Sequence, residues 1–330
     1  MLSKTPPHGL VLALGGGGAK GLAHIGVLQV LEEEAIPVRA IVGTSVGAEV
    51  GAFLAVGMPM SELVSLATSF DWKRTLQLFL PDLSTSGGFA SGKNIMEFLS
   101  NGLGQGRVIE ALSIGYAAVA TDLETGKQVV LDRGSLIDAV RASISMPALL
   151  APYAIDGRLL VDGSVVNPVP FDVAHAVFGG PVLAVAVNAG ALSLIPQELL
   201  VPTSPPGASR GRQLLARSWM KLAAPIRGWL HEPVSHVQHN NKKPVMWSTH
   251  RVLDRAMDIT TAQLMQLRLQ LQPPDLMLAP DVRRIGTLEF YRGKEAIAAG
   301  RAVATAWLPE IRELLRTSTV QASRKLSDVS

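Results

Sequence analysis

Cysteine is missing from this chain of 330 residues, and charged residues make up only 17% of it. Without cysteine the protein forms no disulfide, holds no thiolate-bound metal and uses no cysteine nucleophile. A formal net charge of +3 is too small to indicate a nucleic-acid partner by itself. Because hydrophobic residues reach 48%, the composition is that of a globular protein with a sizeable core.

Long hydrophobic runs are missing as well. No run reaches the roughly 20 apolar residues that a membrane-spanning helix needs. Residues 1–9 lack the apolar stretch of a signal peptide, and we expect them to form a short N-terminal tail. The sequence therefore predicts a cytoplasmic protein that is at most peripheral at a membrane.

Strand-like and helix-like segments alternate at the start of the chain. Residues 10–14 and 39–42 are short apolar runs, and helical patterns over 22–34 and 46–56 follow them. This alternation predicts an α/β fold, with a mainly parallel sheet covered by helices on both faces. Further strands are predicted at 116–120, 128–131, 159–161, 182–187 and 275–278, and further helices at 135–143, 253–271 and 294–315.

Three segments stand apart from this pattern. Residues 83–106 are rich in glycine and serine, which predicts a mobile surface connection. Residues from about 203 to 251 are basic and contain proline, which predicts an insertion or lid. The polar end, 317–330, is predicted to be a disordered tail. One catalytic domain over 10–316, carrying the insertion, accounts for the rest.

The sequence contains two G-x-S-x-G motifs. In such a motif the serine stands on a sharp turn between a strand and a helix, with its hydroxyl exposed. Residues 43–47 (GTSVG) follow a predicted strand and open a predicted helix, whereas 207–211 (GASRG) follow two prolines in a polar, basic stretch. The context therefore favours Ser45 as a nucleophile over Ser209.

A glycine-rich loop, GGGGAKG at 15–21, follows the first predicted strand. Its G-x-G-x-x-G spacing suggests dinucleotide binding, but that site needs an acidic residue at the end of the second strand, where this chain has 42–45 (VGTS). The alternative is an oxyanion hole, because such a loop presents several backbone N–H groups at a helix N-terminus. The second interpretation fits a serine nucleophile nearby, and no cofactor is expected.

Asp162 and Gly163 follow the apolar residues 159–161. An aspartate at the end of a strand stands where catalytic groups collect in α/β sheets, although Asp-Gly turns are most often structural. The chain has no H-E-x-x-H motif and no carboxylate cluster with calcium-loop spacing, so no metal is expected.

Taken together, these motifs resemble those of the patatin-like phospholipases, and within them the bacterial RssA-like branch. The glycine loop, the GTSVG turn and the DGS step occur in the order of that family and at its approximate spacing. The resemblance covers about 10–188 and 253–300, and includes further stretches at 26–28, 121–126, 141–143 with Pro147, 167–170 and 273–282. It implies a patatin / FabD-lysophospholipase-like fold.

The resemblance also implies roles for individual residues. Ser45 would be the nucleophile and Asp162 the base of a Ser–Asp dyad, with an oxyanion hole in the backbone of Gly16, Gly17 and Gly18. One departure is Ser164, where the family usually has glycine or alanine; its hydroxyl could hydrogen-bond Asp162 and change its basicity. The residues that support these motifs would be Lys20, Gly21, Gly43, Gly47 and Gly163.

A carboxylate is a weak base unless burial raises its pKa, so we expect a partly desolvated Asp162. The rival arrangement is a Ser–His–acid triad, in which the histidine follows the acid. His24 is expected to be structural or to orient the glycine loop. On chain order alone, the candidates for a triad histidine are His175, His231, His236, His239 and His250.

The predicted activity is hydrolysis of lipid acyl esters, by a phospholipase, lysophospholipase or carboxylesterase. Acyl transfer with the same dyad and a non-catalytic adaptor role are the alternatives. Residues 212–230 alternate basic and apolar side chains and include two tryptophans, a pattern typical of segments that bind anionic membrane surfaces. We predict a lid or a peripheral membrane contact there, with an amphipathic helix that covers the core as the alternative.

Overall fold

The computed structural model describes residues 8–79, 88–188 and 249–327. The chain divides into two compact units, one made of Met1–Ala189 with Pro274–Ser330 and the other of Gly190–Pro273. In the second unit the structure describes the helix α12 (Thr249–Leu271). The predicted membrane segment 212–230 lies outside the described residues, as does the predicted insertion up to residue 248. None of the helices in the described ranges is long and apolar enough to cross a membrane.

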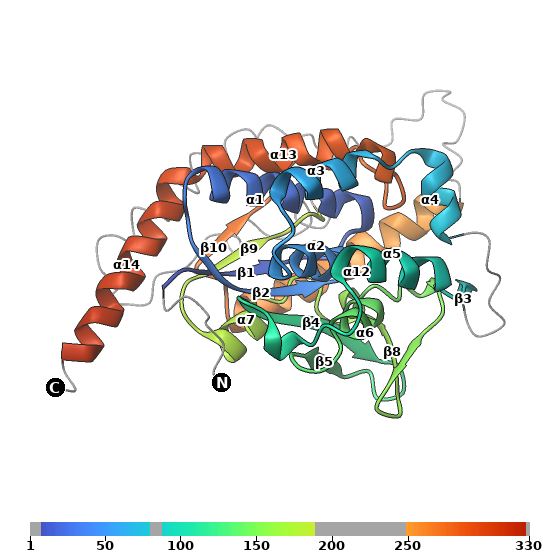
Figure 1. Cartoon of the computed structure of the whole chain (residues 1–330), viewed down its shortest axis with the longest axis horizontal. Coiled ribbons are helices and arrows are strands. Elements are labelled where there is room, and N and C mark those ends of the chain that lie inside the picture. Colours follow the sequence, from blue (N-terminus) through green and yellow to red (C-terminus); the bar gives the residue numbers. More distant parts are fainter. Residues whose placement is uncertain (1–7, 80–87, 189–248, 328–330) are drawn as a thin grey trace, which may run out of the picture. The chain divides into compact units, whose positions relative to one another are not determined.

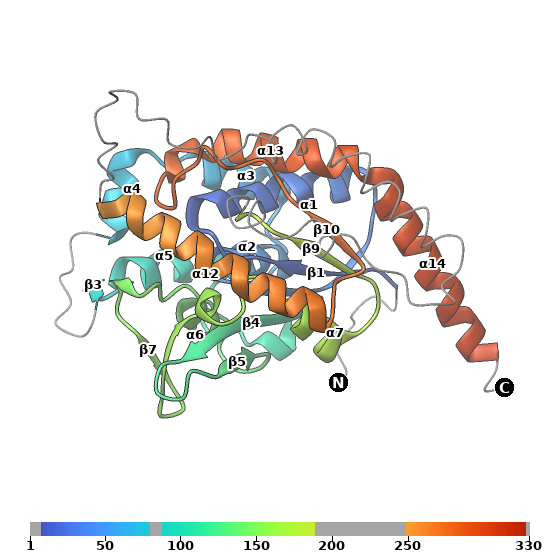
Figure 2. The same ribbon diagram turned by 180° about the vertical axis from the view of Figure 1, so that it is seen from behind.

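The first unit is built on an eight-stranded sheet with the order β10-β9-β1-β2-β4-β8-β7, and β5 pairs with β4 beside this path (Figures 1 and 2). Every residue of β1 is buried, because helices cover both faces of the sheet there. The five parallel strands are β1 (Leu10–Leu14), β2 (Val38–Thr44), β4 (Gly115–Asp122), β9 (Val182–Val185) and β10 (Leu276–Leu278).

Three strands run antiparallel to their neighbours: β5 (Gln128–Leu131), β7 (Tyr153–Ile155) and β8 (Arg158–Asp162). The structure thus confirms the predicted α/β class with its mainly parallel sheet. Short β3 (Gly88–Ala90) and β6 (Ala148–Leu150) form a separate pair.

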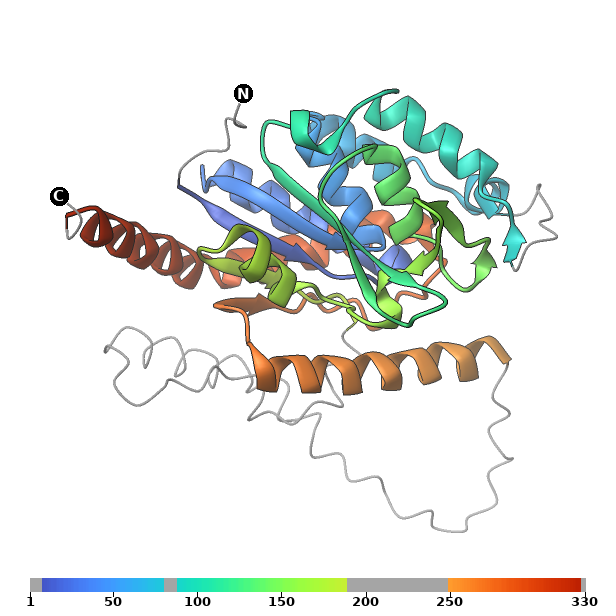
Figure 3. The ribbon, with the colours of Figure 1, turned by 90° about the horizontal axis from the view of Figure 1, so that it is seen from below.

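Helices cover both faces, as the chain order requires. Because crossovers between parallel strands are right-handed, α1 (Ala23–Glu33) and α2 (Val46–Ala55), which lead from β1 toward β4, lie on one face. The chain then returns to β9 through α7 (Phe171–Phe178), which packs on β1, β2 and β9 from the other face (Figure 3). Alongside α1 lies α13 (Gly293–Ala306).

The close approach of α1 and α13 depends on two glycines. A Cβ on Gly300 would lie 1.9 Å from the carbonyl oxygen of Ala23, and one on Gly26 would lie 2.0 Å from that of Ile297. No other residue allows the two backbones to come so near. The remaining α-helices of the first unit, within the described residues, are α3 (Met60–Thr68), α4 (Trp72–Phe79), α5 (Lys93–Leu103), α6 (Leu136–Ser143) and α14 (Leu308–Ser327).

The structure corrects three predicted segments. Residues 88–103 are not a mobile connection but contain β3 and α5, whose Ile95, Leu99 and Leu103 are buried. The predicted helix 294–315 is two helices, α13 and α14, which meet at Trp307. The polar end, which was predicted to be a disordered tail from residue 317, is helical in the structure as far as Ser327. Polar composition alone did not reveal that the helix continues.

Candidate active site

Ser45 lies on the sharp turn between β2 and α2, with φ 55° and ψ −129°. Two hydrogen bonds fix the backbone of this turn. The Ser45 N–H donates to Ser143 Oγ at 2.9 Å, and the Ser143 hydroxyl donates to the Val119 carbonyl at 2.6 Å. The flanking glycines give the turn room: a Cβ on Gly47 would lie 2.2 Å from the Leu14 carbonyl oxygen, and one on Gly43 would lie 2.3 Å from the backbone of Ala48. This geometry is that of a nucleophile elbow.

The Ser45 hydroxyl donates a hydrogen bond of 2.5 Å to Oδ2 of Asp162. Both side chains are buried, with 4% and 3% of their surface exposed. Asp162 is the last residue of β8, and strand register explains how it reaches the serine. Asp162 pairs with Ala120 of β4, next to Val119, which pairs with Thr44 of β2. The sheet therefore brings together two residues that are 117 positions apart.

Burial raises the pKa of the Asp162 carboxyl, while hydrogen bonds from the Ser45 hydroxyl and from the backbone and side chain of Ser164 lower it. Desolvation is the largest of these effects, so the carboxylate is a stronger base than an exposed one. Its backbone is fixed, because its N–H donates to the Ser145 carbonyl at 2.9 Å and its carbonyl accepts from the Thr121 hydroxyl at 2.9 Å. The predicted desolvation of Asp162 is confirmed.

The glycine loop lies beside the serine, since a Cβ on Gly16 would be 3.1 Å from that of Ser45. The Gly16 N–H donates to the Pro168 carbonyl at 2.9 Å, so it is not available to a substrate. Among the described residues, no partner accepts from the N–H of Gly17 or Gly18. This differs from the prediction, which included Gly16: the loop offers two free donors rather than three.

The other motif residues support these loops. Lys20 is buried in the 3₁₀ helix η1 (Gly18–Leu22). Gly21 allows contact with the elbow, because a Cβ there would lie 2.1 Å from the Val46 side chain. Gly163 is pressed against β4, where a Cβ would be 2.2 Å from the Val119 carbonyl oxygen.

Two of the histidines singled out in the sequence, His24 and the triad candidate His175, have described side chains. His24 is fully buried, and its Nε2 donates to the Gly15 carbonyl at 2.7 Å. Burial lowers its pKa to about 4, so it is neutral near pH 7 and braces the glycine loop. His175 lies on α7, with Nε2 3.9 Å from the carboxylate of Asp275. The side chains of His231, His236, His239 and His250 lie outside the described residues.

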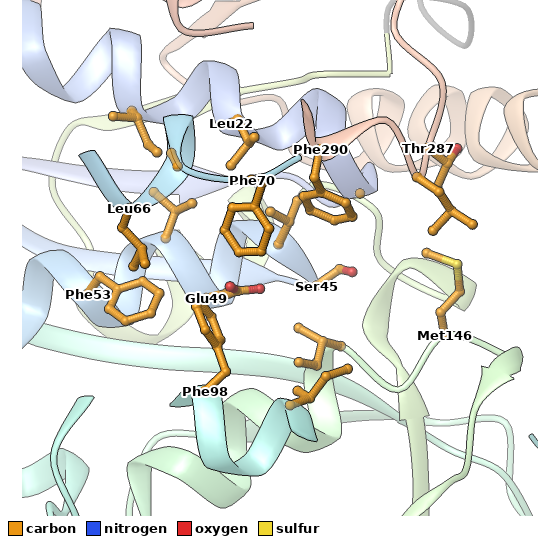
Figure 4. A pocket seen from close by; sticks show the side chains of 18 of the residues that line it. Leu22, Ser45, Glu49, Phe53, Leu66, Phe70, Phe98, Met146, Thr287 and Phe290 are labelled. Atoms are coloured by element: carbon orange, nitrogen blue, oxygen red, sulfur yellow. The ribbon is translucent and has the colours of Figure 1, made fainter. Parts of the chain in front are cut away.

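A pocket opens at Ser45 and encloses about 860 Å³, part of which is open to solvent (Figure 4). Its walls are almost entirely apolar and include the rings of Phe53, Phe70, Phe98 and Phe290. No sequence pattern predicts this pocket, because its wall is formed by segments as distant in the chain as Leu22 and Phe290. Within the described ranges, no three His, Asp or Glu side chains gather closely enough to hold a metal.

Comparison with known proteins agrees with this site. A family model described as patatin-like phospholipase matches residues 12–175, which include both Ser45 and Asp162. An uncharacterized NTE family protein of Mycobacterium tuberculosis is 34% identical over 328 residues, covering 90% of each chain. A second one from that organism is 33% identical over 314 residues, covering 93% of this chain and 47% of its own. Mouse patatin-like phospholipase domain-containing protein 6 is 35% identical over 187 residues, covering 54% of this chain and 13% of its own.

Proposed function

The chain belongs to the patatin-like phospholipase family, and we propose that it is a serine hydrolase of lipid acyl esters. The observation that carries this proposal is the 2.5 Å hydrogen bond from the Ser45 hydroxyl, which lines an apolar pocket, to the buried Asp162 carboxylate. A serine needs a neighbouring base to accept its proton, and here that base is a carboxylate whose pKa is raised by burial.

The reaction proceeds in two halves. In the first, Ser45 Oγ attacks the ester carbonyl carbon and passes its proton to Asp162 Oδ2. The carbonyl oxygen becomes an oxyanion, which accepts hydrogen bonds from the N–H groups of Gly17 and Gly18. When the intermediate collapses, the C–O bond to the alcohol breaks and Asp162 returns the proton to the departing alcohol oxygen. The acyl group then remains on Ser45.

In the second half, water replaces the alcohol. The water oxygen attacks the acyl carbon while Asp162 takes a proton from the water. A second oxyanion then forms and accepts hydrogen bonds from the same two N–H groups. Collapse breaks the bond to Ser45 Oγ, which receives the proton from Asp162, and the free fatty acid leaves. The apolar walls of the pocket hold the acyl chain and keep bulk water from the base.

Labelling with a fluorophosphonate probe tests the dyad, because the probe reacts only with an activated serine. We expect wild type and Ser209→Ala to be labelled and Ser45→Ala and Asp162→Asn to remain unlabelled. Product analysis with a long-chain ester then separates hydrolysis from acyl transfer, since only hydrolysis releases free fatty acid without an added alcohol. A folded wild type that neither reacts with the probe nor cleaves esters would favour the adaptor role instead.

We also propose a branch of the family for this chain and a membrane-contacting segment. The stretch PPDLMLAPDV at 273–282 favours the RssA-like branch of the family. The basic segment 212–230 favours peripheral contact with anionic membranes. Liposome sedimentation of the triple variant Arg212→Gln, Arg217→Gln, Lys221→Gln tests the second one: binding equal to that of wild type would reject membrane docking through this segment.

A further inference from the structure

Glu49 is an unexpected residue in the wall of the pocket. Among the described residues that line the pocket, it is the one with a titratable side chain, and the others are apolar apart from Ser45, Thr287 and a glycine. Glu49 lies on α2 four positions after the nucleophile, and residues with this spacing share one face of a helix. In the view of Figure 4, Glu49 lies between Ser45 and the rings of Phe53 and Phe98.

The carboxyl of Glu49 has no hydrogen-bond or ion-pair partner within the described parts of the chain. The hydroxyl of its titratable neighbour Tyr116 donates a hydrogen bond of 2.9 Å to the Ala48 carbonyl and not to Glu49. Glu49 is half-buried, and desolvation by the apolar wall around it raises the pKa of its carboxyl to about 7. Near neutral pH a large share of this side chain is therefore a protonated carboxyl, with one O–H donor and further acceptor capacity.

An unpaired polar group in an apolar pocket costs free energy that a ligand can recover by pairing with it. A plain hydrocarbon chain would strip water from Glu49 and offer no partner. A chain with a hydroxyl or keto oxygen at the right place would satisfy the carboxyl and still fill the apolar walls. This argument rests on the function proposed above: we propose that Glu49 selects acyl esters whose chain carries a hydroxyl or keto oxygen close to the ester group.

Helix geometry indicates where on the chain that oxygen would lie. Four residues along a helix span about 6 Å, and long side chains on a helix lean back toward its N-terminus, here toward Ser45. That distance corresponds to a few carbon–carbon bonds of about 1.5 Å each, so the oxygen would lie at roughly the third to sixth carbon of the acyl chain. An oxygen at the far end of a long chain would pass beyond Glu49.

The test compares three esters of 4-nitrophenol with decanoyl, 3-hydroxydecanoyl and 10-hydroxydecanoyl chains. For wild type at neutral pH we expect kcat/KM for the 3-hydroxy ester to exceed that of the other two by about 3- to 10-fold, the effect of one added hydrogen bond. Glu49→Leu should lose this preference and cleave the plain ester faster than wild type does. Glu49→Gln, whose amide still donates and accepts, should keep most of it.

The controls separate this inference from the function on which it rests. The acetyl ester, whose chain is too short to reach Glu49, should be cleaved alike by wild type and the surface variant Glu62→Gln. If both cleave it but wild type shows no preference among the three longer esters, or if the preference survives Glu49→Leu, the inference about Glu49 is wrong and the hydrolase activity remains. If no ester is cleaved, the inference about Glu49 is tested by calorimetric binding of decanoate and 3-hydroxydecanoate to wild type. Equal affinities for the two acids would reject the role of Glu49.

Discussion

Gly16 and Ser164 face each other so closely that a Cβ on Gly16 would lie 2.2 Å from Ser164 Oγ. Gly16 belongs to the glycine loop and Ser164 lies two residues after Asp162, so this contact joins the two halves of the candidate site. A side chain at position 16 would therefore force the Ser164 hydroxyl or the glycine loop to move.

We therefore expect Gly16→Ala to lower kcat/KM for ester hydrolysis, and we expect a second substitution, Ser164→Gly, to remove the clash. The added methyl group displaces the loop from Ser45, and misplacements of about 1 Å cost on the order of 10²-fold in rate. The double variant Gly16→Ala/Ser164→Gly should recover a large part of kcat/KM, and Ser164→Gly alone should remain active. A double variant as slow as Gly16→Ala would show that the contact with Ser164 is not the cause.

Ser164 is also expected to set the pH dependence of catalysis. Its side chain lowers the pKa of Asp162 by hydrogen bonding, so Ser164→Ala should raise that pKa. The carboxylate acts as a base only above its pKa, and the acid limb of the kcat/KM profile should therefore move to higher pH. Profiles of wild type and Ser164→Ala on one soluble ester measure this shift. Superimposable acid limbs would contradict it.

Asp162→Asn keeps the shape of the side chain but removes the base. We expect kcat for ester hydrolysis to fall by about 10²- to 10⁴-fold, the usual contribution of a general base. Asp156→Asn makes the same change on an exposed turn and should leave kcat unaltered. A small loss in Asp162→Asn, with its fold intact by circular dichroism, would mean that another group takes the serine proton.

His24 should make the fold sensitive to acid. Its pKa is about 4 in the folded protein, whereas the ordinary value for histidine is 6.5, so the unfolded chain binds the proton more tightly. The contribution of neutral His24 to the free energy of unfolding is fully present above about pH 6.5. It falls by roughly 3 kcal/mol as the pH drops toward and below 4. Urea unfolding at pH 7 and pH 4.5 should show a smaller loss in His24→Gln than in wild type. Equal losses in the two proteins would exclude His24 as the cause.

Gly300 tests the packing of α13 on α1. Because a Cβ at this position would lie 1.9 Å from the Ala23 carbonyl oxygen, Gly300→Val must push the helices apart. We expect a loss of about 2–3 kcal/mol or more in the free energy of unfolding. Ala302→Val introduces the same side chain at an exposed position of α13 and should cost much less. Similar losses for the two variants would point to helix propensity rather than packing.

The local pattern of the sequence was sufficient to predict the fold class and to place Ser45 on a turn between a strand and a helix. Apolar runs of strand length, each followed by a helical pattern, predicted β1, α1, β2 and α2, because residue periodicity reflects which side of each element is buried. Ser45 was distinguished from Ser209 by the same local context. Asp162 does stand at the end of a strand, but that strand is antiparallel to its neighbour, and the register of β8 against β4 brings Asp162 level with Ser45.

Tertiary structure alone decided which loop groups are free and what the pocket contains. The N–H of Gly16 donates to the Pro168 carbonyl and that of Ala19 donates to the Thr287 carbonyl, because segments distant in sequence lie beside the loop. Neither N–H is therefore free for a substrate. No local pattern encodes such pairings. Glu49 reads in the sequence as an ordinary helix residue, and only the packing of Phe53, Phe70 and Phe98 around it makes it a lone carboxyl in an apolar pocket. The sequence by itself determined the elements and the turn that carries Ser45, whereas the desolvation that raises the pKa of Asp162 and of Glu49 arises only when those elements pack together.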